Sequence, residues 1–172
     1  SLHMNEISAS QVWLLSPYDH PQRPIEPCGD MAEDRSKTSD MVRGMTVMGV
    51  EQTCLDPNLY GLGDKGARIV AFKGDTSDLV PAMLGGVSDL IILDVPDVLV
   101  ALSHWQGRIK VLGPISQKQD MAVAFSLDDK DLLSEFEAFY GQLIASGEYR
   151  DMVEKYYPSL FLHFPSFLGG SR

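Results

Sequence analysis

The sequence is poor in cysteine, in basic residues and in long apolar runs. It holds two cysteines among 172 residues, and its 14 lysines and arginines stand against 24 aspartates and glutamates, for a formal net charge of −10. No lysine- or arginine-rich run occurs, which excludes the positive patch that duplex nucleic acid requires. No apolar stretch approaches the roughly 20 residues of a membrane-spanning helix. The cysteines and the four histidines lack the spacing of a zinc site, so we expect neither a metal nor a cofactor.

The two cysteines, Cys28 and Cys54, lie in the turn-like stretches "EPCGD" and "QTCLDP". Two states fit this spacing: one disulfide between them, or two reduced structural thiols. The sequence leaves both open.

The stretch "GLGDKGARIVAFKGD", residues 61–75, has the glycine spacing of a dinucleotide-binding loop. Such a loop functions only where a strand has just ended and a helix begins. Here the glycines are followed by a strand-like segment, "RIVAF", and they come at the end of a helix-compatible one. We therefore predict turn glycines and no nucleotide site.

Strand-like and helix-like segments alternate along most of the chain. We expect strands at 11–18, 45–50, 68–72, 89–93, 109–113 and 121–125, and helices at 37–44, 54–67, 75–86, 94–105, 128–147 and 148–158. Thr38 or Ser39 would cap the first helix, and the proline-rich residues 19–36 would form a loop. This alternation predicts a three-layer α/β domain with a mostly parallel sheet.

The ends of the chain differ from its middle. Residues 1–11, which open with "SLHM", are predicted to be a vector-derived or disordered lead, and residues 12–158 a single lobe. Residues 159–172 form an aromatic tail that either packs on this domain or docks on another lobe or subunit.

Ligands of open α/β sheets lie beyond the carboxyl ends of the strands, so the residues that follow each strand are candidates for a site. Thr53 and Cys54 follow one strand in "GVEQTCLDP", and Asp94 follows another in "LIILDVPD". Thr53 offers a hydroxyl and an N–H to a carboxylate, and Asp94 offers a charge to an ammonium group. Together they suit an amino-acid zwitterion. Threonine and aspartate are also preferred helix N-caps, and the pattern leaves both roles open.

Three segments carry a resemblance to a known family. They are the strand and turn from Gly44 to Thr53, a stretch with Leu84, Gly86, Asp89 and Asp94, and a terminal pattern with Gly147, Tyr149, Lys155 and Tyr156. Over residues 12–158 the chain resembles the second lobe and closing helices of bacterial periplasmic solute-binding proteins that capture polar amino acids. The resemblance implies a type II lobe, a periplasmic or other extracytoplasmic location, and service to the permease of an ABC importer or to a membrane sensor kinase.

The resemblance also implies residue roles and two departures. The position of Thr53 binds the ligand carboxylate and that of Asp94 its amino group, with Gln52 and Cys54 beside them. Gln52 stands where the family has glycine. The first lobe that should precede "SPY", residues 16–18, has no counterpart, so the chain is either a piece of a larger protein or a solitary lobe.

Three hypotheses follow for function. The first is a binding module without catalysis, for an amino-acid-like molecule or a small carboxylate. The second is an enzyme built on the same lobe, a dehydratase or the regulatory lobe of a peptidoglycan lyase, with Asp94, Glu51 or His104 as proton donor. The third is a structural homodimer formed through the face of the missing lobe and the aromatic tail.

Overall fold

The computed structural model describes residues 9–24, 31–120 and 123–158, and the chain divides into two compact units. The sheet unit is Ser10–Gln119, and the helical unit comprises Ser1–Ala9 with Asp120–Arg172. The predicted span of one lobe, 12–158, crosses this boundary and stays a prediction. Within the described ranges, no helix is both long and apolar enough to cross a bilayer.

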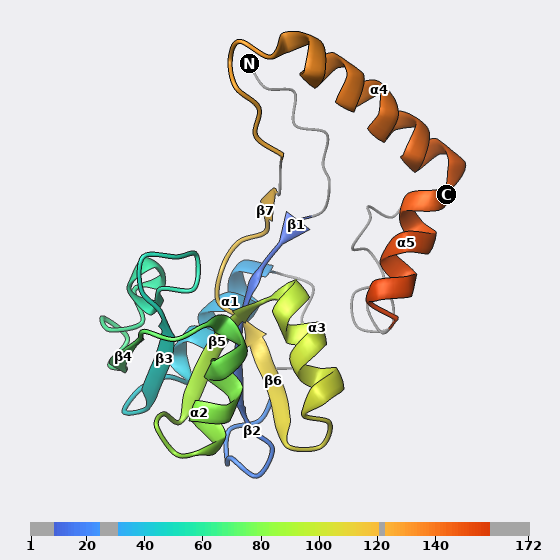
Figure 1. Ribbon diagram of the computed structural model, residues 1–172. Helices are drawn as coiled ribbons and strands as arrows, with labels where there is room; N and C mark the ends of the chain where they lie inside the picture. The colour runs from blue at the N-terminus through green and yellow to red at the C-terminus, as the bar shows by residue number, and fades with distance from the viewer. Residues whose placement is uncertain (1–8, 25–30, 121–122, 159–172) are drawn as a thin grey trace. The chain divides into compact units, whose positions relative to one another are not determined.

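The sheet unit is built on five strands. These are β2 (Val12–Pro17), β3 (Thr46–Val50), β4 (Arg68–Phe72), β5 (Leu90–Asp94) and β6 (Ile109–Pro114). Their order is β4-β3-β5-β2-β6 (Figure 1). Strand β3 is parallel to β4 and β5, whereas β2 is antiparallel to β5 and β6. The sheet is therefore mixed, with one reversed strand among four that share a direction.

Helices cover both faces of this sheet. They are α1 (Met31–Asp40), α2 (Leu79–Leu84), which follows the 3₁₀ turn η2 (Thr76–Asp78), and α3 (Val95–His104). Figure 1 shows α2 and α3 in front of the sheet and α1 behind it. The predicted three-layer α/β architecture is confirmed.

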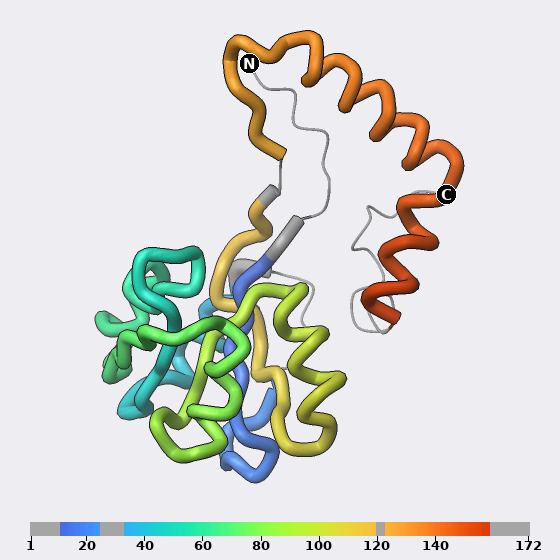
Figure 2. Tube along the Cα trace, viewed as in Figure 1, coloured from blue at the N-terminus to red at the C-terminus, as the bar shows by residue number. Residues whose placement is uncertain are grey.

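Strand β2 is an interior strand of the sheet, between β5 and β6, although it comes from the start of the unit, as the tube in Figure 2 traces. Its Leu14 and Leu15 are fully buried, as are Ile91 and Ile92 of the neighbouring β5. Both strands have apolar side chains on successive positions, the pattern of strands covered on both faces. This explains why the positions of these two strands agree with the prediction to within one residue.

Helix α1 begins and ends earlier than expected, at Met31 and Asp40, so residues 31–36 are helix rather than loop and residues 41–44 are turn rather than helix. The acidic residues Glu33 and Asp34 lie in its first turn, where the helix dipole favours them, and Lys37 Nζ pairs with Glu33 at 2.7 Å. Thr38 is buried and donates from Oγ1 to the Asp34 carbonyl at 2.9 Å. The prediction that Thr38 or Ser39 caps the helix was wrong.

The helix expected at 54–67 was also wrong. The chain there forms turns around one short 3₁₀ helix, η1 (Pro57–Tyr60). Asp56 caps η1 by accepting the Asn58 N–H at 3.0 Å, and Gly61 ends it at a φ of 61°. The strand that follows these turns, β4, lies where it was predicted.

Short strands β1 (Ala9–Ser10) and β7 (Gln119–Asp120) form a separate two-stranded pair. Of the strand predicted at 121–125, Met121 and Ala122 lie outside the described residues, and residues 123–125 are not strand.

The helical unit has α4 (Lys130–Ser146) and α5 (Glu148–Tyr156), both as predicted, joined at Gly147. An aromatic chain holds them together: Phe125, Phe136, Tyr140 and Tyr149 follow one another at centroid distances of 5.2, 5.9 and 5.5 Å. The aromatic tail and residues 1–8 of the lead lie outside the described residues.

Candidate functional site

The carboxyl ends of β3, β4 and β5 meet at one edge of the sheet because these strands are parallel. Val50 is in register with Phe72 there, and Asp94 pairs with Val12 at the start of the reversed β2. We call this the carboxyl edge. Ligands of open α/β sheets bind at such an edge, so the turns that leave it hold the candidate site.

The turn Gln52–Cys54 leaves β3 at the carboxyl edge without entering a helix, contrary to the sequence prediction. Thr53 Oγ1 donates to the Val50 carbonyl at 2.8 Å and accepts the Leu55 N–H at 3.0 Å. Its hydroxyl proton is therefore held inside the turn, and no helix dipole adds positive potential at this point. Of the two donors expected from Thr53, the backbone N–H is the one left for a ligand.

Gln52 adopts a φ of 60°, in the left-handed region that favours glycine. Its N–H points to Asp56 Oδ2 at 3.5 Å, and its side chain is exposed. This is the position where the resembling family has glycine. The turn thus combines a backbone conformation that favours glycine with an exposed amide side chain.

Asp94 ends β5 and caps α3, where its Oδ1 accepts the Asp97 N–H at 3.2 Å. Asp97 lies in the first turn of α3, and its pKa is raised to about 6 by burial first, then by the charge of Asp94 and a hydrogen bond to that carboxyl. In the part of the chain that the structure describes, no ion pair reaches either carboxyl. Among the described residues, this carboxyl pair therefore has no compensating cation.

Cys54 belongs to the same cluster. Burial raises the pKa of its thiol, and the charge of Asp94 raises that pKa further, so the thiol and the carboxylate lie near each other. Tyr60 of η1 donates its hydroxyl to the Cys54 carbonyl, and burial raises the pKa of that phenol. Cys54 is exposed and forms no disulfide within the described residues, and Cys28 lies outside them, so the disulfide stays a prediction.

The other acid–base candidates are not all brought to this edge. Glu51 is exposed in the turn after β3. His104 ends α3, ten residues after Asp94, which is about 15 Å along a helix, and its Nδ1 lies 3.0 Å from the Val100 carbonyl. Asp97 was missed by the sequence prediction. The one signal for it was the second aspartate of "DVPD", three residues after the cap.

Metal binding has no support in the described ranges, where no three His, Cys, Asp or Glu side chains are placed to hold an ion. The cluster at the carboxyl edge has two carboxyls, one thiol and one phenol. Its chemistry is that of an acidic surface suited to an ammonium group.

No family model and no curated protein matches this chain. Solved structures do. A mutant of ArgBP from T. maritima matches with a TM-score of 0.70 at 18% identity, over 90% of this chain and 60% of that one. The GluR0 ligand-binding core from Nostoc punctiforme in complex with L-glutamate gives 0.65 at 13%, over 88% and 63%. A structure from work on glutathione import via GshT and the cystine ABC importer TcyBC of Streptococcus mutans matches with a TM-score of 0.69 at 16% identity. The match covers 90% of this chain and 61% of that one.

These likenesses establish the fold. The chain has the architecture of the periplasmic solute-binding proteins that its sequence resembles, and it spans about 60% of the length of the structures it matches. The matched structures are described by binding or import and not by catalysis.

Proposed function

We propose that the carboxyl edge is one half of a binding site for a small amino-acid-like molecule. The observation that carries this proposal is the Asp94 and Asp97 pair, which lies without a cation at the edge where this fold binds ligands. A half-buried pair of carboxyls is stabilised when a cation binds beside it. The ligand's ammonium group supplies that cation.

Asp94 receives the ammonium group through the carboxylate oxygen that does not cap α3. Thr53 meets the ligand's carboxylate with its backbone N–H, because its hydroxyl proton is held by Val50. Gln52 and Cys54 border the ligand from the same turn. The helix dipole expected at Thr53 is missing, so recognition by this chain rests mainly on the ammonium group.

The remaining half of the site would come from a first lobe, in line with the share of the matched structures that this chain spans. In that setting the protein serves an ABC importer or a membrane sensor outside the cytoplasm. Homodimerisation and the enzyme alternative stay predictions, and no feature of the edge favours them over binding.

The test is ligand-induced stabilisation of the purified chain. We expect at least one among L-alanine, L-glutamate, L-glutamine and L-arginine to raise the melting temperature, and its analogue without the amino group to leave it unchanged. At about ten times Kd a ligand stabilises the folded state by about 1.4 kcal/mol, or a few degrees in Tm.

Asp94→Asn should abolish that shift. Asparagine caps a helix as well as aspartate does, so the variant keeps α3 and loses the charge. Asp19→Asn is the matched control, since Asp19 is exposed in the turn after the reversed strand β2, at the opposite edge of the sheet from Asp94. If a ligand still raised the melting temperature of Asp94→Asn, Asp94 would not be part of the site. If no ligand raised the melting temperature of the unsubstituted chain, the proposal that this chain alone forms a binding half-site would be wrong.

A further inference from the structure

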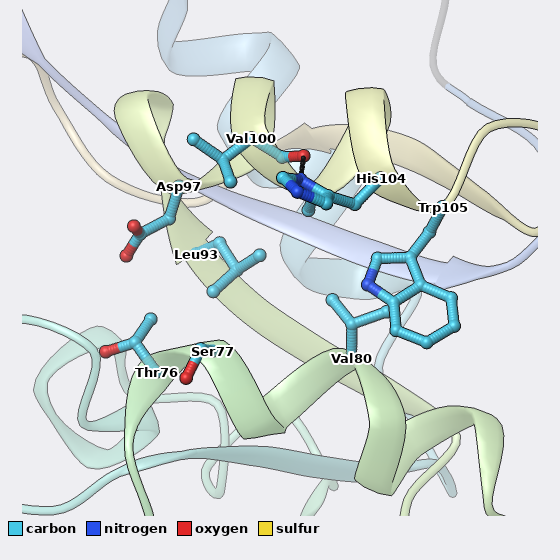
Figure 3. A pocket seen from close by; sticks show the side chains of 9 residues that line it. Thr76, Ser77, Val80, Leu93, Asp97, Val100, His104 and Trp105 are labelled. Carbon is cyan, nitrogen blue, oxygen red and sulfur yellow. Dashed lines mark hydrogen bonds between the residues drawn. The ribbon is translucent and has the colours of Figure 1, made fainter.

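A cavity lies between α3 and the segment formed by η2 and α2, and no residue of the turn after β3 lines it. We call it the α2–α3 pocket (Figure 3). It has a volume of about 400 Å³, within the size range of small-molecule sites. Its lining residues are Thr76, Ser77, Val80, Leu93, Asp97, Val100, Ala101, His104 and Trp105.

The pocket has a polar end and an apolar end. Figure 3 shows Asp97 and Thr76 at one end and the Trp105 indole at the other, with Leu93, Val80 and the His104 ring between them. Leu93 and Val80 are buried and form an apolar wall opposite His104, whose Nδ1 lies 3.0 Å from the Val100 carbonyl. Such a cavity matches a molecule with one polar terminus and an apolar body.

The charge at the polar end of the pocket determines which polar group of a ligand can bind there. Asp97 is half-buried, its neighbouring charge is the carboxylate of Asp94, and no ion pair reaches it within the residues that the structure describes. An anion would add a third negative charge, and a neutral group would leave the pair uncompensated. A cation is the terminus that this end stabilises.

The apolar end of the pocket determines which apolar part of a ligand fits there. Trp105 lies eight residues after Asp97, which is about 12 Å along the axis of α3. Aromatic rings pack well against an indole, and the buried side chains of Val80 and Leu93 suit a hydrocarbon spacer. The Arg108 guanidinium lies 5.3 Å from the Trp105 ring centroid, which helps to fix the indole.

We propose that the α2–α3 pocket binds an aryl-alkyl amine, with its ammonium group on Asp97 and its ring against Trp105. This site lies on the face of the sheet that α2 and α3 cover. It shares the Asp94 and Asp97 pair with the proposed solute site and rests on that pair, but Val80, Leu93 and Trp105 belong to this pocket alone, so binding here is tested separately from binding at the turn after β3.

The test uses phenylbutylamine as probe, with phenylbutanol and phenylbutyrate as its neutral and anionic counterparts. Trp13 and Trp105 are the two tryptophans of the chain, so Trp13→Phe leaves Trp105 as the one fluorophore. We expect a saturable change in its emission with the amine, and at least tenfold weaker binding of the alcohol and the acid. Calorimetry on the unsubstituted chain repeats the comparison without that substitution.

Two variants and one control locate the probe. Asp97→Asn should weaken the amine at least tenfold and leave the alcohol unaffected. Ser77→Phe places a ring in the pocket from an exposed position and should block both. Asp78→Asn is the control, because Asp78 is exposed in η2 and does not line the pocket. Equal binding of amine and alcohol, full affinity in Asp97→Asn, or no saturation by about 10 mM amine would overturn the proposal.

Discussion

The carboxyl of Asp97 holds its proton to higher pH in the folded chain than an exposed aspartate does, with a pKa of about 6 against 3.8. The folded state therefore binds more protons than the unfolded state between these two values. The resulting stabilisation is fully present below about pH 4 and is lost as pH rises through about 6. We expect the stability of the native chain relative to Asp97→Asn to fall over this window, by about 1 kcal/mol after allowance for solvent screening.

Urea unfolding of both proteins at several pH values measures this difference. The same comparison in an Asp94→Asn background separates the effect of burial on the Asp97 pKa from the effect of the Asp94 charge. Because burial is the larger cause, most of the pH dependence of the stability difference should remain. If the free energies of unfolding of the native chain and of Asp97→Asn changed in parallel with pH, the folded and unfolded states would bind the Asp97 proton equally, and the prediction would be wrong.

The role of a single site residue could be predicted from the sequence where the residues next to it determine that role. Asp94 follows an apolar strand and precedes a proline by two positions, and it does cap α3. Thr38 and Thr53 were not predictable in this way, because a threonine hydroxyl bonds equally well to a neighbouring carbonyl inside a helix or a turn. The burial of Asp97 comes from tertiary packing and leaves no mark in the sequence around it.

At the scale of elements, the turn after β3 depends on Gly49. A Cβ at this strand position would lie 2.1 Å from the Leu55 carbonyl oxygen and 2.8 Å from Pro57 Cδ. Gly49→Ala must push the turn off the strand, and we expect it to destabilise the protein by about 2 to 3 kcal/mol. Chemical unfolding followed by circular dichroism measures the loss.

Gly141→Ala is the matched substitution for that experiment. Gly141 lies in α4, and a Cβ added there would have no described atom within 4 Å beyond its own helix backbone and chain neighbours. Alanine there should stabilise the helix by up to about 1 kcal/mol. If Gly49→Ala were as stable as the native chain, the close packing of the turn on β3 would be refuted.

Strands were predicted better than the elements between them. The apolar runs of β2, β4 and β5 define strands without reference to the rest of the chain. Residues 54–67 fit a helical pattern in part, but Pro57 and three glycines favour turns, and these local preferences decided the structure. The start of α1 was predicted too late because its first turn consists of charged residues. Such residues occur as often in loops, so their pattern does not indicate a helix.

At the scale of the whole molecule, the order of strands could be predicted only in part. Alternating helices and strands indicate crossovers and a layered sheet, which the structure has. The insertion of β2 between β5 and β6, in the opposite direction, is a non-local pairing that no local pattern encodes. For the same reason, no local pattern indicates that the chain divides after Gln119.

That division makes the sheet unit a candidate for independent folding. Its hydrophobic core cluster, as far as the chain is described, runs from Val12 to Ile115, and among the described residues the one buried hydrophobic side chain outside the sheet unit is Tyr140. Since burial of apolar side chains supplies most of the free energy of folding, residues 10–119 alone should unfold cooperatively, with a stability near that of the same transition in the full chain.

Fluorescence during urea unfolding reports this transition, because Trp13 and Trp105 both belong to the sheet unit. A broad transition, or exposed apolar surface that binds a hydrophobic dye, would show that the sheet unit needs the helical unit to fold. A cooperative transition would give a fragment that carries both the carboxyl edge and the α2–α3 pocket. Binding measured on that fragment would then be assigned to the sheet unit alone.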